Sequence, residues 1–266
     1  MNVASQVMRA HDRKTETLHN DLIFGWFADH RLELADSDQT RLFDEALARL
    51  AAIASTSTLR EGETLYLESD KAERCYEVLD GCLRLISILP DGTRHVGEFL
   101  HRGDLLGFGP QPIHQHTVEA VSDVRVLSFP RPAFFKIAND NPVLASAINL
   151  ALAKMAERAA RRFRMVACFG AIGRVAVFLL DYAAQAGTAQ SGTLGYPNVG
   201  ATGAQCIHLP MRRCDIADHI GLSVETVCRA ITKLRNKGLI VMPDPHHFLI
   251  PSQRQLENFV LNDDAL

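Results

Sequence analysis

A single apolar stripe runs along the segment from residue 141 to residue 167. Its members are separated by 4, 4, 3, 4, 4 and 3 residues, an eleven-residue repeat that keeps one stripe aligned along a nearly straight helix. At about 1.5 Å per residue, this helix is about 40 Å long. We therefore expect a partner helix and a homodimer; packing of the stripe on its own domain is the alternative. The residues assigned to the dimer contact are Leu144, Ile148, Leu152, Met155, Ala159 and Phe163.

The chain upstream of this helix has a different residue pattern. Residues 1–40 are polar and are expected to form an arm, and residues 43–54 place apolar side chains at helical spacing. From about residue 55 to residue 137, short segments rich in Val, Leu, Phe and Tyr alternate with turn residues such as Asp80-Gly81 and Asp91-Gly92. This regular recurrence of turn residues between apolar segments predicts an antiparallel barrel or sandwich built from hairpins.

Composition narrows the class of protein. The 266 residues predict about two domains, and 28 Lys and Arg against 31 Asp and Glu argue against a polybasic nucleic-acid binder. The six cysteines are scattered without a CxxC pair, which fits a reducing cytoplasm. The N-terminus shows no basic segment followed by an apolar core, and no apolar run approaches about 18 residues. We expect a cytoplasmic protein that is neither exported nor embedded in a membrane.

Residues 207–250 carry the most informative pattern. A first helix, ending at Gly221, has Ile216, Ala217 and Ile220 on its inner side, and Gly permits the left-handed turn that ends a helix. Ser223 is the expected N-cap of a second helix that runs to residue 237. The pair predicts a helix-turn-helix, followed by a β-hairpin wing. The buried stripe of the second helix is Val227, Ala230, Ile231 and Leu234.

The opposite face of the second helix has the chemistry of DNA reading. Glu225, Cys228 and Arg229 lie there at i, i+3 and i+4. Arg229 can donate to O6 and N7 of a guanine, and Glu225 can accept from the amino group of a cytosine. The alternative is a plain helical pair with a charged outer face. The other residues assigned to DNA are Ser223, Thr226 and the phosphate-binding cations Arg212, Arg213, Lys233, Arg235 and Lys237.

The sequence DIADHIGLSVETVCRAITKLRNKGLI strongly resembles the DNA-binding signature of the CRP/FNR superfamily of bacterial transcription regulators. The likeness extends over roughly residues 40 to 252 and is nearest to the FixK-like and FNR-like branch, whose recognition helix has the form E-x-x-S-R; Cys228 replaces the serine. The resemblance implies a homodimeric activator that recognises a TTGAT-N4-ATCAA pseudo-palindrome and contacts RNA polymerase.

The implied architecture is α+β, with four parts. They are an N-terminal arm (1–40), a cyclic-nucleotide-binding-type β-roll (41–140), a dimerisation helix (141–168) and a winged helix-turn-helix domain (169–266).

The resemblance also raises the question of a ligand. Cyclic-AMP-binding relatives have a Glu soon after the glycine turn and an Arg-Ser pair that meets the phosphate; at these places this chain has Phe108 and the run His114, Gln115, His116. Iron–sulfur relatives use several N-terminal cysteines, and here none precedes Cys75. We therefore expect neither group and assign no cofactor. An unidentified effector in the β-roll is the alternative.

Two of the cysteines are candidates for control by oxidation. Cys228 on the DNA face and Cys214 beside Arg212 and Arg213 are candidate redox thiols, whose oxidation would weaken DNA binding; passive thiols are the alternative.

No metal site is expected, because histidines such as His114 are more simply surface or turn residues. No hydrolase, zincin, Walker-type or dinucleotide motif is present, so an enzyme is not expected. A small-molecule-binding module whose helix-turn-helix no longer reads DNA is the remaining alternative class.

Overall fold

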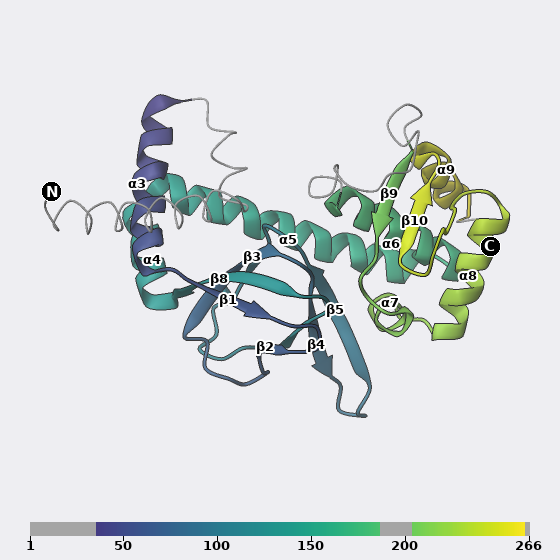
Figure 1. Ribbon diagram of the computed structural model, residues 1–266, viewed down its shortest axis with the longest axis horizontal. Helices are drawn as coiled ribbons and strands as arrows, with labels where there is room; N and C mark the ends of the chain where they lie inside the picture. The colour runs from purple at the N-terminus through teal and green to yellow at the C-terminus, as the bar shows by residue number, and fades with distance from the viewer. Residues whose placement is uncertain (1–35, 187–203, 264–266) are drawn as a thin grey trace, which may run out of the picture. The chain divides into compact units, whose positions relative to one another are not determined.

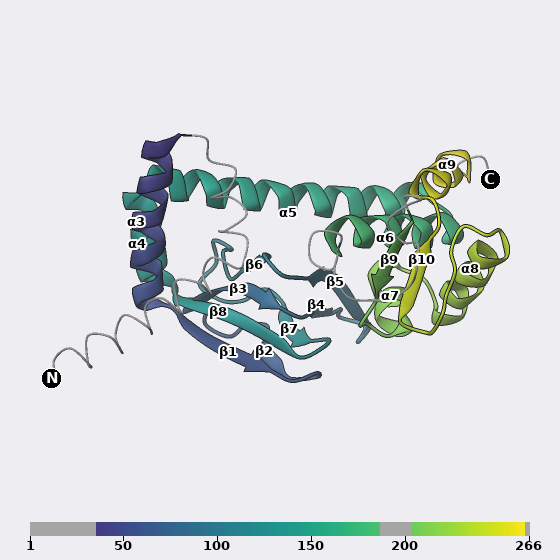
Figure 2. The ribbon, with the colours of Figure 1, turned by 45° about the horizontal axis from the view of Figure 1, so that its top comes forward.

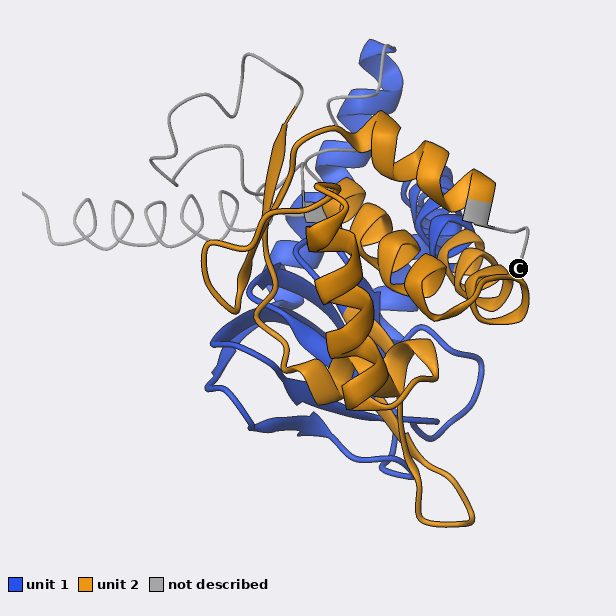
Figure 3. Ribbon diagram, turned by 90° about the vertical axis from the view of Figure 1, so that its right-hand side faces the viewer, with its two compact units in different colours: residues 1–85, 100–155 blue, residues 86–99, 156–266 orange. Residues whose placement is uncertain are grey.

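The computed structural model describes residues 36–186 and 204–263, which form two compact units. Unit 1 takes its described residues from Met1–Leu85 and Leu100–Met155, and unit 2 from Ile86–Phe99 and Ala156–Leu266 (Figure 3). The division differs from the four expected parts in two respects: residues 86–99, assigned above to the β-roll, group with the DNA-binding part, and the expected dimerisation helix is divided after residue 155. Most of the expected arm lies outside the described residues, and its end already belongs to a helix that begins at Ser37.

The expected antiparallel strands form two four-stranded sheets, although Asp80-Gly81 connects one sheet to the other and does not close a hairpin (Figure 1). The first has the order β1 (Ser55–Leu59), β8 (Val124–Pro130), β3 (Arg74–Asp80), β6 (Leu105–Leu106). The second has the order β2 (Thr64–Tyr66), β7 (Thr117–Ala120), β4 (Leu83–Ile88), β5 (Arg94–Leu100). Gly81 joins β3 to β4 at φ 86°, and a Cβ there would collide with the carbonyl oxygen of Asp123. Only glycine fits this turn.

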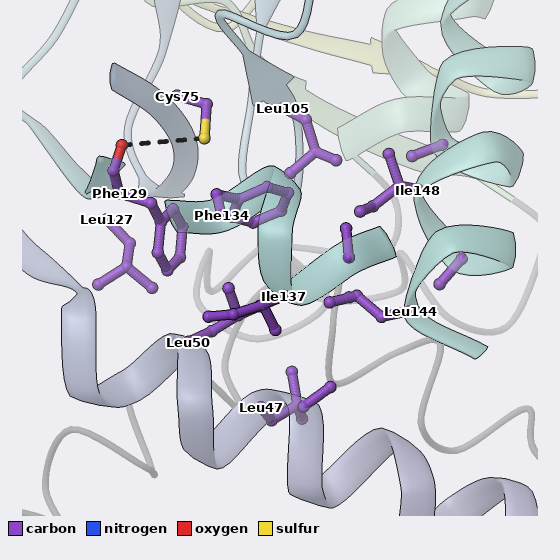
Figure 4. Close-up of a cluster of buried hydrophobic side chains, with 14 of the residues drawn as sticks. Leu47, Leu50, Cys75, Leu105, Leu127, Phe129, Phe134, Ile137, Leu144 and Ile148 are labelled. Atoms are coloured by element: carbon purple, nitrogen blue, oxygen red, sulfur yellow. Dashed lines mark hydrogen bonds between the residues drawn. The ribbon is translucent and has the colours of Figure 1, made fainter. Parts of the chain in front are cut away.

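Three helices complete the core of unit 1. They are α3 (Ser37–Ile53), α4 (Arg131–Asp140) and the first half of α5 (Pro142–Cys168). Asp36 caps α3 by accepting a hydrogen bond from the backbone N–H of Asp38 at 3.0 Å. The helices bury their apolar faces together with β3 and β8, as Figure 4 shows. Large side chains of this core include Phe43, Leu47, Leu50, Phe129, Phe134, Ile137, Leu144 and Ile148.

The long helix α5 is continuous from residue 142 to residue 168, as expected (Figure 2). Its apolar stripe, however, does not have one environment. Leu144 and Ile148 are buried in the core of unit 1, whereas Leu152 and Phe163 are 37% and 75% exposed. Met155 is half-buried and Ala159 is exposed. The part of the stripe that a second chain can reach therefore begins at Leu152.

Unit 2 contains α6 (Ala171–Ala186), α7 (Arg213–Ile220), α8 (Val224–Asn236) and α9 (Gln253–Asp263). Strands β9 (Gln205–His208) and β10 (His247–Ile250) pair antiparallel and, with the turn that precedes β10, form the wing. The hairpin expected after α8 differs: its first arm is not a named strand and contacts β10 through the bridge between Val241 and Leu249. The expected inner faces of α7 and α8 are buried, including Ile216, Ile220, Val227 and Leu234. In the described part of the chain, no helix combines the length and apolar character that a membrane span needs.

Candidate DNA-binding surface

The turn between α7 and α8 has the geometry that the sequence predicted. Gly221 ends α7 in the left-handed region at φ 67°, and the N–H of Leu222 donates to the carbonyl of Ala217 at 3.0 Å. Ser223 caps α8, because its hydroxyl accepts from the N–H of Thr226 at 3.2 Å. The hydroxyls of Ser223 and Thr226 also lie 2.8 Å apart. Helix α8 therefore starts at a defined residue, which fixes the direction of the side chains in its first two turns.

Helix α8 presents Glu225, Cys228 and Arg229 to solvent. The side chains of Glu225 and Arg229 are 87% and 73% exposed, and a carboxylate oxygen lies 4.0 Å from a guanidinium nitrogen. An ion pair that is this exposed and this long contributes little to the stability of the fold, and both side chains can exchange it for other partners. The two side chains lie side by side and can still turn towards a ligand. This face offers one acceptor and one bidentate donor, as base-edge reading requires.

The cations around this face divide into two groups. Arg212, Lys233, Arg235 and Lys237 are exposed and can lie against a phosphate backbone. Arg213 is half-buried: its guanidinium donates to the carbonyl of Pro245 at 2.6 Å and lies 4.8 Å from the centre of the Phe248 ring. The structure thus places Arg213 against the wing, and Arg212 is the member of the pair exposed to solvent.

The wing is ordered by its own hydrogen bonds as well. Asp244 accepts from the N–H groups of His246 and His247 at 2.9 and 3.0 Å, and from Nδ1 of His247 at 2.7 Å. These donors, the N–H of His246 above all, hold the pKa of Asp244 below its usual value. A carboxylate that stays charged keeps the turn closed, so Arg213 and Asp244 together fix the position of the wing.

Helix α7 is held by a strand from far away in the sequence. Arg94 on β5 donates from Nη2 to Oδ1 of Asp215 at 2.8 Å and from Nη1 to Oδ2 of Asp218 at 2.6 Å. The Asp215 side chain is only 2% exposed, and it also accepts from the backbone N–H of Arg212 at the start of α7. Sequence reasoning missed this contact, because nothing in the local pattern around Arg94 indicates a partner more than a hundred residues away.

The same strand contacts His219 at the other end of α7. Nδ1 of His219 lies 3.1 Å from the carbonyl oxygen of Val96, which can only accept, so His219 is the donor. The imidazole ring packs against Phe99 and Phe178, with centroids 5.1 and 5.8 Å away. Burial lowers the pKa of His219 to about 3, and Arg162 adds to this shift. His219 is therefore neutral at pH 7 and is part of the packed base of α7.

A second arginine binds the turn between α7 and α8. Arg174, on α6, donates from Nε to the carbonyl of Phe169, just beyond the end of α5, at 2.9 Å. Its Nη1 reaches the carbonyls of Ile220 and Gly221 at 3.2 and 3.3 Å. One guanidinium thereby satisfies terminal carbonyls of two helices. The end of the long helix and the helix-turn-helix turn are linked by one side chain.

Unit 1 contains a separate cavity of about 440 Å³ in the β-roll. His114, expected at the surface, is instead buried and stacks on Tyr66 with ring centroids 3.6 Å apart. Arg131 at the cavity donates to the backbone carbonyls of Gly109, Gln111 and Ala72. Further lining residues include Leu85, Leu100, Leu105, Leu106, Phe108, Gln115, His116, Leu152 and Met155. Among the described residues, no group of three or more His, Cys, Asp or Glu could hold a metal ion.

Two protein-family models match successive parts of the chain. A model of the cyclic nucleotide-binding domain matches residues 56–141, and a model of the Crp-like helix-turn-helix domain matches residues 173–259. The second match covers the turn, the recognition face and the wing described above. The first covers most of the two sheets of the β-roll.

Individual relatives agree with these matches. The nitrogen fixation regulation protein FixK of Rhizobium meliloti (strain 1021) is 31% identical over 188 residues, which are 71% of this chain and 79% of that protein. The transcriptional activatory protein AadR of Rhodopseudomonas palustris is 29% identical over 192 residues, 72% of this chain and 76% of that protein. The structure of FixK2 from Bradyrhizobium japonicum matches with a TM-score of 0.67 and 28% identity, and covers 77% of this chain and 96% of that one. The chain therefore belongs to the FixK-like branch of the CRP/FNR superfamily, and it is a DNA-binding transcription regulator rather than an enzyme.

Proposed function

We propose that the protein reads a TTGAT-N4-ATCAA pseudo-palindrome as a homodimer, with one recognition helix in each half-site. The observation that carries this proposal is the exposed face of α8, on which Glu225, Cys228 and Arg229 lie together at the start of a capped helix. Arg229 donates to the guanine of TTGAT, and Glu225 accepts from a cytosine on the complementary strand. Arg212, Lys233, Arg235 and Lys237 hold the phosphates on both sides.

The dimer forms along the second part of α5. Leu152, Met155, Ala159 and Phe163 lie on one side of the helix, and Leu152 and Phe163 expose apolar surface that a second copy can cover. Two recognition helices then reach successive major grooves, about 34–36 Å apart. The protein acts as an activator; this part of the proposal is supported by the relative AadR, whose name describes a transcriptional activatory protein. It acts in the cytoplasm, and its β-roll contacts RNA polymerase.

Neither cyclic AMP nor an iron–sulfur cluster takes part in this proposal. The β-roll cavity does not fit a cyclic phosphate, because the guanidinium of Arg131 is used by three backbone carbonyls. Phe108 packs edge-on against Phe134 at 5.1 Å and provides no polar group for a ribose. A buried phosphate without charge-assisted partners is unfavourable. The cavity leaves an unidentified, less polar effector as a second candidate.

The test is fluorescence anisotropy with labelled duplexes at fixed salt. We expect tight binding to the pseudo-palindrome with two chains per duplex, and affinity lower by roughly 10³-fold or more for a duplex with both half-sites scrambled. A duplex with one half-site scrambled should lie between these limits. Equal affinity for all three duplexes would show that α8 does not read this sequence.

Control by oxidation is the other candidate. Cys214 and Cys228 are both exposed, and the Cys228 thiol interacts electrostatically with Arg213, which holds the wing. An acid formed at Cys228 would place negative charge beside phosphate and beside Arg213. We expect peroxide to weaken binding of the wild type to the pseudo-palindrome and to leave a Cys214→Ser/Cys228→Ser variant unaffected. Unchanged binding of the peroxide-treated wild type would exclude redox control at these thiols.

A further inference from the structure

The helix-turn-helix depends on a strand that lies outside the sequence range of its domain. Strand β5 pairs within the sheet β2-β7-β4-β5, yet three of its residues contact α7. Arg94 binds the first turn of α7 through Asp215 and also binds Asp218. The Val96 carbonyl and the Phe99 ring contact His219 in the last turn. One strand therefore holds α7 at both ends.

The charged part of this contact is the part that fixes a position. Asp215 is nearly fully buried, and its carboxylate has a defined site between Arg94 and the backbone N–H of Arg212. A planar guanidinium that binds two carboxylates has one favoured orientation, so it constrains both distance and angle. The apolar contacts of Phe99 allow more sliding, since dispersion has little directional preference.

We propose that Arg94 is a positioning residue for DNA recognition: it fixes α7 on β5 and so sets the angle at which α8 meets the major groove. Helix α7 passes this position to α8 through the short turn, in which Leu222 is bonded to Ala217 and Ser223 caps the next helix. The inference rests on the proposed function, because it assumes that α8 reads bases. It adds that residues 86–99 belong to the DNA-reading apparatus.

The position of β5 gives this contact a second consequence. Because β5 is hydrogen-bonded within the sheet and ion-paired to α7, a shift of β4 and β5 in the sheet moves the site of Arg94 and hence the start of α7. A device that only stabilised the fold would not need a charged group at this place, since well-packed apolar residues serve at least as well.

The test compares full-length Arg94→Ala with wild type on the pseudo-palindrome and on a fully scrambled duplex. We expect affinity for the pseudo-palindrome to fall about 10-fold, while affinity for the scrambled duplex stays the same, because the exposed cations that bind phosphate are unaltered. Arg94→Lys should recover part of the loss, since one ammonium can bind one carboxylate. Arg60→Ala, which removes an exposed arginine of unit 1, is the control and should bind both duplexes like wild type.

Three results would overturn the proposal. They are unchanged binding by Arg94→Ala, an equal loss on both duplexes, and no recovery by Arg94→Lys. If Arg94→Ala does not fold, Asp218→Asn decides, because it removes only the part-exposed half of the contact; it should lower the ratio of the two affinities about 3-fold, and an unchanged ratio contradicts the idea. Failure of the wild type itself to prefer the pseudo-palindrome would instead refute the proposed function.

Discussion

Replacing Arg229 with alanine is expected to cost about 1–3 kcal/mol of binding free energy in each half-site of the pseudo-palindrome. The reason is geometric. Arg229 is 73% exposed on the second turn of α8, and among the described residues its ion-pair partner is the distant, exposed carboxylate of Glu225. A guanidinium in this state can give both donors to O6 and N7 of one guanine. In a dimer the loss occurs twice, so this substitution should have the largest effect of any single change on the face.

The measurement is anisotropy with the matched duplex and with a duplex in which the contacted G·C pair is replaced. Arg229→Ala should bind the two duplexes with similar affinity, whereas wild type should prefer the first. Arg235→Ala is the matched control from the same helix: it should weaken binding to every duplex alike and reduce the salt slope by about 2, about 1 for each protomer. If Arg229→Ala keeps the wild-type preference for guanine, another side chain reads that base.

Local signals predicted the helix-turn-helix correctly. Gly221, Ser223 and the stripe of Val227 and Leu234 act within one or two turns of their own position, through a left-handed turn, a cap and burial. The same holds for Gly81 in the β-roll, where the backbone itself requires glycine. Interactions that are decided by neighbours in sequence can be predicted from sequence.

Interactions between distant segments could not be predicted in this way. The periodicity of α5 correctly indicated an apolar face, but periodicity does not say what covers that face. Leu144 and Ile148 proved to be covered by the chain's own core. Likewise, the charge of Arg213 suggested phosphate binding, whereas the fold brings Pro245 and Phe248 to it. The contacts of Arg94 and His219 could be found only in the tertiary structure, because their hydrogen-bond partners lie more than 120 residues away.

Replacing Phe163 with glutamate is expected to dissociate the dimer. Phe163 is 75% exposed in the single chain, so its burial must come from a partner if the proposed interface is correct. Burying a phenylalanine contributes about 1.5–3 kcal/mol, and a symmetric interface contains two of them. The introduced carboxylates would also face each other in an apolar seam. Sedimentation equilibrium should show monomers at concentrations where wild type is dimeric, and binding to the pseudo-palindrome should fall to that of a single half-site.

The control for this substitution is Lys154→Glu. Lys154 is exposed and lies nine residues before Phe163, about 2.5 turns along α5, so it faces the opposite side of the helix. The same carboxylate placed there should leave the dimer intact. The stability of the monomer separates the two readings of the stripe: if Phe163 packs on its own chain, Phe163→Glu should lower the unfolding temperature. If it packs on a partner, the unfolding of the isolated monomer should be nearly unchanged, because its glutamate is already in water. A Phe163→Glu variant that remains dimeric would place the interface elsewhere on the chain.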